Sequence, residues 1–138
     1  MADTDDKIDP TILELHAKLC RTMAHPLRLA LLNALRNGER TVGDLGQAVG
    51  AKQPLVSQHL AVLRNQGLLH YWRNGNEVYN SIAYPKTLQA CDLLREVLFE
   101  HLQAQRRLLA TDQTPPSRIV APSAGGRQFD RMDDRAPL

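Results

Sequence analysis

The sequence predicts a mainly α-helical domain with one small β-hairpin, an α+β arrangement built around paired short helices. Apolar residues return every three or four positions over most of the chain, as on the buried face of a helix. Two short helical segments are separated by a glycine-containing turn, which is typical of a helix-turn-helix. An Asn-Gly pair lies between two runs rich in aromatic and β-branched residues, which indicates a β-hairpin. Together these observations predict a winged helix-turn-helix.

Two helices separated by a proline are expected to open the domain. Residues 11–23 place apolar side chains on one face, and Asp9 and the proline after it suit the start of this helix. His25-Pro26 ends it, because the residue before a proline avoids the helical conformation. A second helix is predicted from Pro26 through Leu35, ended by Asn37-Gly38, which tolerate left-handed backbone conformations.

The helix-turn-helix itself is predicted between Thr41 and Gly67. Thr41 and Asp44 have the spacing of a capping box, so a short helix should begin there and end at Gly50. After the turn, a second helix should run from Gln53 to Gln66 before Gly67 ends it. Its buried side is expected to carry Leu55, Val56, His59, Leu60, Val62 and Leu63.

Strands are predicted at 68–73 and 77–83, joined by a turn in which Asn74-Gly75 supplies the two central residues with positive φ. A last helix should follow Tyr84-Pro85 and run to about residue 108. Its apolar stripe contains Leu88, Cys91, Leu94, Leu98 and Leu102. A domain of this size has too little core to cover so long a stripe, so we expect a homodimer formed through residues 11–23 and 85–108.

The domain is therefore expected over residues 10–108, between two segments without a predicted fold. Residues 1–9 are acidic and residues 111–138 are polar, interrupted by proline and glycine and without periodicity, so both are expected to be disordered. No apolar stretch approaches the roughly 20 residues of a membrane helix. The acidic start does not resemble a signal peptide, so we expect a cytoplasmic protein that does not bind membranes.

The formal net charge of +2 conceals a segregation of charge along the chain. Residues 18–95 carry ten Lys and Arg against four Asp and Glu, a difference of +6, whereas residues 1–10 carry four Asp and one Lys, a difference of −3. A basic middle segment favours an anionic partner such as nucleic acid. We expect much of this basic charge to lie on the surface that contacts the partner.

Several motifs resemble the ArsR/SmtB group of bacterial repressors. They are Met23-Ala24-His25-Pro26-Leu27-Arg28, the run from Val56 to Arg64, Gly67-Leu68-Leu69, and the Arg73-Asn74-Gly75-Asn76 hairpin before Val78-Tyr79. The resemblance covers about residues 10–105. It implies a DNA-binding transcriptional repressor that recognises an inverted-repeat operator as a homodimer.

The second helix of a helix-turn-helix lies in the major groove, with its N-terminal side chains at the base edges. Glutamine can form two hydrogen bonds with adenine, and the amides at a helix start suit a phosphate. The candidate DNA-binding residues are Thr41, Lys52, Gln53, Ser57, Gln58 and Arg64, with Arg73, Asn74 and Asn76 in the wing. The alternatives are a merely solvated helix face and a winged-helix module that binds protein but not DNA.

The sequence contains two cysteines, Cys20 and Cys91, which are too few to stabilise a secreted disulfide scaffold of this size. In a reducing cytoplasm they would be free thiols, metal ligands or a redox pair. Since the resemblance implies release of DNA by an effector, one hypothesis is thiol oxidation or persulfidation at these residues. A second is a metal ion held by His16, Cys20 and Cys91, although two or three N/S ligands do not complete a zinc site. The third is ordinary packing of small apolar side chains. No other cofactor is expected.

An enzymatic activity is not predicted. The sequence contains no nucleophile elbow, glycine-rich phosphate loop, HExxH motif or paired carboxylates. Asp44 and Glu77 are isolated acidic residues that suit a helix cap and a turn better than acid–base chemistry.

Overall fold

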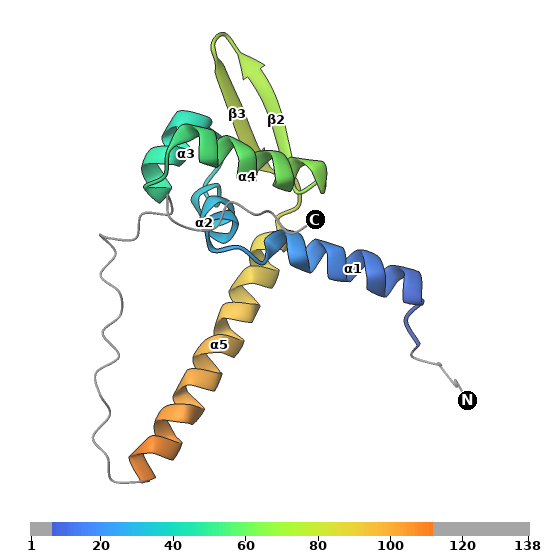
Figure 1. Cartoon of the computed structure of the whole chain (residues 1–138), viewed down its shortest axis with the longest axis vertical. Helices are drawn as coiled ribbons and strands as arrows, with labels where there is room; N and C mark the ends of the chain where they lie inside the picture. The colour runs from blue at the N-terminus through green and yellow to red at the C-terminus, as the bar shows by residue number, and fades with distance from the viewer. Residues whose placement is uncertain (1–6, 112–138) are drawn as a thin grey trace.

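The computed structural model describes residues 7–111 (Figure 1). In chain order its elements are α1 (Pro10–Met23), α2 (Pro26–Ala34), β1 (Arg40–Thr41), α3 (Val42–Val49), α4 (Gln53–Asn65), β2 (Leu69–Asn74), β3 (Glu77–Ile82) and α5 (Lys86–Thr111). This architecture confirms the predicted winged helix-turn-helix. Most of the acidic start and nearly all of the predicted tail, residues 1–6 and 112–138, lie outside the described residues.

Side chains cap the starts of three helices: the caps at Asp9 and Thr41 were predicted, and a third, at His25, was not. The Asp9 carboxylate accepts a hydrogen bond from the backbone N–H of Thr11 at 2.7 Å, and Nδ1 of His25 accepts one from the N–H of Leu27 at 3.1 Å. The Thr41 hydroxyl oxygen accepts one from the N–H of Asp44 at 3.1 Å. Each bond satisfies an N–H group that has no partner within its helix. The end of α2 differs from the prediction: the helix stops at Ala34, and a turn leads to Gly38.

The core lies where α2, α3 and α4 pack together. Four leucines of α2 and the turn after it meet one residue of α3 and three of α4, and Cys91 joins them from α5. The buried apolar residues are Leu27, Leu31, Leu32, Leu35, Leu45, Val56, Leu60, Leu63, Leu68, Leu69 and Cys91. Burying a leucine side chain contributes about 1.5–3 kcal/mol, so this cluster fixes the relative positions of the three helices.

The sheet has three antiparallel strands in the order β1-β3-β2, so the predicted two-stranded hairpin was incomplete. β1 pairs with β3 through Arg40–Asn80 and Thr41–Tyr79. This strand was not predicted, because a strand of two residues is too short to show an alternation of apolar and polar side chains. The predicted turn was also wrong by one position. Asn74 pairs with Glu77, so Gly75-Asn76 forms the loop, and Gly75 adopts the positive φ of 63° that glycine tolerates best.

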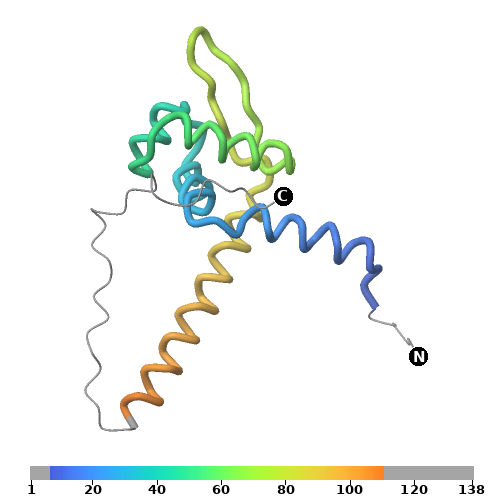
Figure 2. Tube along the Cα trace, in the orientation of Figure 1, coloured from blue at the N-terminus to red at the C-terminus, as the bar shows by residue number. Residues whose placement is uncertain are grey.

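Helices α1 and α5 project from the winged core in different directions, as the Cα trace in Figure 2 shows. α1 packs against α4, and α5 contacts α2. Arg36, in the turn after α2, donates two hydrogen bonds to the Asp92 carboxylate of α5, at 2.9 and 2.7 Å, and Arg95 adds a third at 3.2 Å. Hydrogen bonding to Arg36 holds the pKa of Asp92 below its ordinary value. The base of α5 is thus attached to α2 by an ion pair and by apolar packing.

Within residues 7–111, none of the helices combines the length and the apolar character that crossing a membrane requires.

Candidate nucleic-acid interface

Helix α4 exposes the polar side chains predicted to read DNA. Lys52, at its N-cap, and Gln53, Ser57 and Gln58 are all exposed. The opposite face of the same helix is buried, through Val56, His59, Leu60 and Leu63. Because the two faces are this different, α4 can turn only its polar face outward, and the structure brings the four predicted residues together on that face.

Gln53 lies over the start of α3. A Cβ atom at position 43 would be 3.1 Å from Nε2 of Gln53, so the glycine at this position leaves room for the glutamine side chain. Gly46 permits the close approach of the turn in the same way, since a Cβ there would lie 3.0 Å from the backbone oxygen of Ala51. The helix-turn-helix angle therefore depends on two small residues of α3.

Thr41 is placed differently from the other candidates. It is buried at 9% exposure, it pairs with Tyr79 in the sheet, and its hydroxyl oxygen accepts the capping hydrogen bond of α3. A phosphate at this position could accept hydrogen bonds from the Thr41 hydroxyl and from the N–H groups at the start of α3. Thr41 thus acts first as a cap.

The wing residues Arg73, Asn74 and Asn76 are exposed near the tip of the hairpin. Side chains alternate between the two faces of the hairpin, so Tyr71 and Arg73 share the face toward α4, with Asn80 and Val78 opposite them in register. On the other face Trp72 stacks on Tyr79, with ring centroids 5.8 Å apart and planes inclined by 9°. Trp72 therefore packs on its cross-strand neighbour, on the face of the hairpin opposite Tyr71 and Arg73.

Arg64 reaches from the last turn of α4 to the wing. Its guanidinium carbon lies 4.4 Å from the centroid of the Tyr71 ring, a cation–π contact. Sequence reasoning selected Arg64 as a phosphate contact but missed Tyr71. The available signal was the alternation of β2, which puts Tyr71 on the same face as Arg73.

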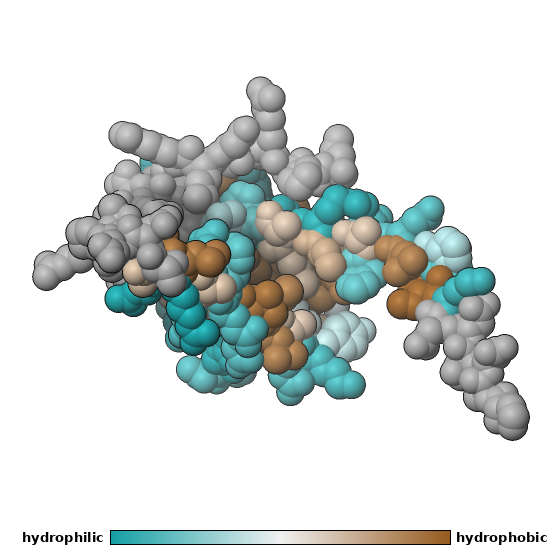
Figure 3. All heavy atoms as spheres, turned by 90° about the horizontal axis from the view of Figure 1, so that it is seen from below, coloured by the Kyte–Doolittle hydropathy of each residue, from teal (hydrophilic) through white to brown (hydrophobic). Residues whose placement is uncertain are grey.

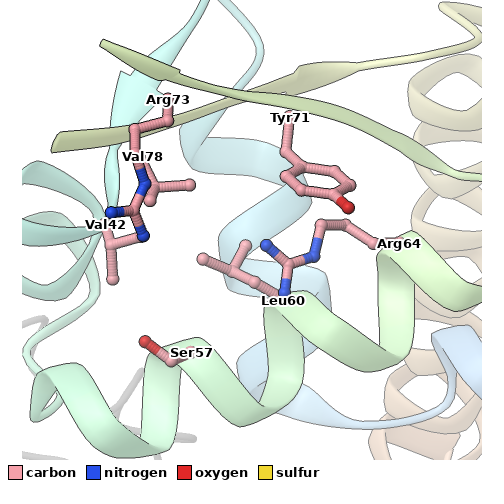
Figure 4. A pocket seen from close by; sticks show the side chains of 7 residues that line it. All are labelled: Val42, Ser57, Leu60, Arg64, Tyr71, Arg73 and Val78. Carbon is pink, nitrogen blue, oxygen red and sulfur yellow. The ribbon is translucent and has the colours of Figure 1, made fainter. Parts of the chain in front are cut away.

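A cleft lies between α4 and the wing, with a volume of about 340 Å³. Figure 4 shows its polar groups: the Arg73 guanidinium points from β2 toward α3 and α4, Arg64 lies beneath the Tyr71 ring, and the Ser57 hydroxyl faces the same space. The cleft is also lined by Val42, Leu60 and Val78. It joins the predicted reading helix and the wing into one surface.

The expectation that much of the basic charge lies on this surface was only partly correct. Arg28, on α2, is fully buried, and burial lowers the pKa of its guanidinium. Its three guanidinium nitrogens have no hydrogen-bond partner within residues 7–111. Arg36 and Arg95 are engaged with Asp92 at the base of α5. The basic residues that remain beside α4 and the wing are Arg40, Lys52, Arg64 and Arg73.

The two cysteines occupy different environments. Cys20 is exposed on α1, whereas Cys91 is 8% exposed and belongs to the core cluster, and both are free thiols. Burial raises the pKa of the Cys91 thiol, although the positive charge of Arg95 acts in the opposite direction. In a single chain, Cys91 is therefore a packed side chain with little thiolate character.

The residues considered for a metal ion do not form a site within one chain. His16 and Cys20 are both exposed on α1, one helical turn apart, while Cys91 lies in the core. In the part of the chain that the structure describes, no three His, Cys, Asp or Glu side chains gather closely enough to hold a metal. A metal site that includes these residues would need further ligands from outside the described part of a single chain.

Comparisons with known proteins agree with this geometry. A family model described as "Bacterial regulatory protein, arsR family" matches residues 25–71. The biofilm growth-associated repressor of Xylella fastidiosa is 38% identical over 78 residues, 56% of this chain and 68% of that protein. The transcriptional repressor PagR of Bacillus anthracis is 38% identical over 94 residues, 67% of this chain and 94% of that protein.

Among solved structures, the chain is similar to a homodimeric winged helix-turn-helix DNA-binding domain from Mycobacterium bovis. The TM-score is 0.60 at 28% sequence identity, and the match covers 75% of this chain and 93% of that one. Fold and sequence comparisons thus indicate the same group of proteins.

The environment of Cys91 predicts slow, strongly pH-dependent alkylation. Because its pKa is raised, the thiolate fraction at neutral pH should lie below that of an ordinary thiol, whose pKa is about 8.5. In the Cys20→Ser variant, the alkylation rate of Cys91 should be at least about tenfold below that of the same protein in urea, and should rise with a midpoint above about pH 8.5. Mass spectrometry of iodoacetamide-quenched samples measures both rates. Equal rates with and without urea would contradict the burial of this thiol.

Proposed function

The chain belongs to the ArsR family of bacterial transcriptional regulators, and from this premise we propose that it represses transcription by binding an inverted-repeat DNA operator as a homodimer. The observation that carries the proposal is the exposed polar face of α4 beside the wing, with Lys52, Gln53, Ser57 and Gln58 on its outer side. A helix presented in this way fits the major groove. The relatives named as repressors and the DNA-binding domain of similar structure support the same function.

The contacts divide into two kinds. Gln53 and Ser57, with Gln58 beside them, can bond base edges and carry sequence preference. Lys52, Arg64 and Arg73 are positively charged and suit phosphates, as do the amides at the start of α3 beside Thr41. Asn74 and Asn76, at the wing tip, are polar and can contact the adjacent backbone. The two groups should therefore affect different quantities in a binding experiment: base contacts the sequence preference, and phosphate contacts the salt dependence of the affinity.

The proposed dimer covers the apolar faces that a single chain leaves exposed. On α1 these include Ile12 and Leu15, at 55% and 59% exposure, and on α5 Leu94 and Leu98, at 66% and 50%. Figure 3 shows hydrophobic residues on the underside of the molecule, including the arm formed by α1. Exposed apolar surface of this extent marks an association site in a folded protein. Residues 11–23 and 85–108 are therefore the proposed interface, and a two-fold dimer would present two α4 helices to one operator.

The proposal places the protein in the cytoplasm, where the DNA is, and gives it no enzymatic activity of its own. The chemistry of the α4 surface supports a role in DNA binding, because amide, hydroxyl and guanidinium groups suit recognition of bases and phosphates. The competing function, a winged-helix module that binds protein only, differs in one measurable property. A DNA-binding protein loses affinity steeply as salt rises, by counterion release.

Sequence-specific binding should depend on Gln53 and Ser57. A duplex selected by the wild-type protein from a random-sequence library should lose about 10- to 100-fold in affinity for the Gln53→Ala/Ser57→Ala variant, since each good base contact contributes about 1–3 kcal/mol. Affinity for a scrambled duplex should change little. Fluorescence anisotropy at several salt concentrations measures both, and Asn37→Ala, in the turn after α2 and outside the proposed dimer interface, is the matched control. Affinity insensitive to salt, or equal loss on both duplexes, would exclude the proposed reading surface.

The dimer should depend on the apolar stripe of α5. Leu98→Glu places a carboxylate in the middle of the proposed interface, so analytical ultracentrifugation at micromolar concentration should show monomers in place of dimers, with a loss of at least about 100-fold in association. Glu96→Gln, also on α5, should remain dimeric. Circular dichroism checks that the Leu98→Glu variant stays helical. An unchanged dimer in this variant would show that α5 is not the interface.

The effector hypothesis concerns Cys20 and Cys91. Our proposal is that oxidation or persulfidation at these thiols lowers DNA affinity by at least about tenfold, a coupling of about 1.4 kcal/mol that is typical of an allosteric effect. Anisotropy with reduced, polysulfide-treated and zinc-treated protein tests it, beside Cys20→Ser and Cys91→Ser. Insensitivity of either serine variant to polysulfide would support the thiol switch. Zinc-dependent release that requires His16 would favour the metal alternative, and identical affinities would mean that the cysteines only pack.

A further inference from the structure

The cleft between α4 and the wing brings two guanidinium groups and a hydroxyl group toward one space. Arg73 enters from β2, Arg64 from the last turn of α4, and Ser57 from the middle of α4, as Figure 4 shows. The three side chains come from segments that are 7 to 16 positions apart in the chain (Ser57 to Arg64, and Ser57 to Arg73). Ser57 and Arg64 lie about two turns apart on α4 itself, and the packing of the wing on α4 adds Arg73 to them.

Among residues 7–111, the rest of the lining is apolar or aromatic and contains no acidic residue. Val42, Leu60 and Val78 complete the walls, and the volume of about 340 Å³ exceeds what one phosphate group needs. Two positive charges that face one space repel each other, and the repulsion is strongest where apolar walls exclude water. An anion between them would remove this repulsion and could be bound by both guanidinium groups at once. The arrangement therefore has the chemistry of an oxyanion site.

Tyr71 determines where the Arg64 guanidinium lies. An arginine at the end of a helix has many accessible rotamers and would otherwise extend into water. The cation–π contact at 4.4 Å holds its guanidinium on the wing side of α4. The planar fork of an arginine held in this way loses less entropy when it binds a phosphate. Tyr71 thus orders a charged group without carrying a charge itself.

We propose that this cleft binds a single phosphate group of the DNA backbone, shared by Arg64 and Arg73, with Tyr71 as the residue that positions Arg64. The inference rests on the proposed function and adds a defined contact to it. Guanidinium groups form paired hydrogen bonds with phosphate oxygens. Since one arginine belongs to the reading helix and the other to the wing, one phosphate would fix both elements in register on the duplex.

The salt dependence of binding separates one shared phosphate from two. Each phosphate that a protein neutralises contributes about 0.9 to the slope of log affinity against log salt. The Arg64→Gln/Arg73→Gln variant should lower the slope by about 0.9 on the library-selected duplex, whereas loss of two separate phosphates would lower it by about 1.8. The affinity losses of the two single variants should also fail to add in the double variant. Lys7→Gln, outside both the cleft and the proposed dimer interface, should leave the slope unchanged.

A slope change of about 1.8 with additive single losses would overturn the shared site, and so would no change at all. Both results leave the proposed function intact as long as the wild-type protein binds the duplex in a salt-dependent manner. Failure of the wild type to select or bind any duplex would instead count against the proposed function itself. Binding of inorganic phosphate to the duplex-bound protein, lost in the Arg64→Gln/Arg73→Gln variant and without any displacement of the duplex at constant ionic strength, would assign the cleft to a free anion and overturn the assignment to DNA.

The positioning role of Tyr71 has its own test. Tyr71→Phe keeps the ring and should bind the duplex like the wild type, whereas Tyr71→Leu should lose about 3- to 30-fold, the range of a cation–π contact. In an Arg64→Gln background, the additional loss caused by Tyr71→Leu should vanish. A loss that persists in this background would show that Tyr71 acts independently of Arg64. Circular dichroism and thermal unfolding confirm that each variant folds.

Discussion

The burial of one face of α4 against α2 and α3 determines where its polar face lies. Leu60 and Leu63 are almost completely buried, whereas Ser57 and Gln58 of the same helix are exposed. Rotation of α4 about its axis would expose these leucines, at a cost of about 1.5–3 kcal/mol for each. The apolar core therefore fixes the orientation of the polar face. Gly43 and Gly46 complete the constraint by letting α3 and the turn approach α4 closely.

The same packing decides which positive charges are available to an anionic partner. Arg28 belongs to the core, and Arg36 holds Asp92 at the base of α5. The net charge and the count of basic residues in the middle of the chain include both arginines. These totals therefore overstate the positive charge of the outer surface. What distinguishes the cleft is the arrangement of Arg64 and Arg73 around one space, with no carboxylate among the described residues that line it. Arrangement rather than total charge makes this surface a candidate for phosphate binding.

Local signals predicted the helices and the polar outer face of α4, because caps, glycines and apolar periodicity act over three or four residues. The Thr41 cap, the turn at Gly50 and the exposed Gln53 are of this kind. The parts that were missed depend on pairing across the chain. The short β1 strand exists only because Thr41 meets Tyr79, and the turn register depends on Asn74 pairing with Glu77. The contact of Arg64 with Tyr71 likewise required the wing to be placed.

The base of α5 links Cys91, through packing and an ion pair, to α4, the helix proposed to read DNA. Cys91 packs in the core, and its neighbour Asp92 holds Arg36 in the turn after α2, while α2 packs directly on α3 and α4. A larger or more polar group on the Cys91 sulfur would not fit this close packing without a shift of α5 or α2. α5 is about 39 Å long, so a small rotation at its base becomes a larger displacement at its far end. In a dimer formed through α5, such a displacement would change the spacing of the two α4 helices, which must match one turn of DNA. The burial that is expected to slow the reactions of Cys91 would therefore also make its modification effective.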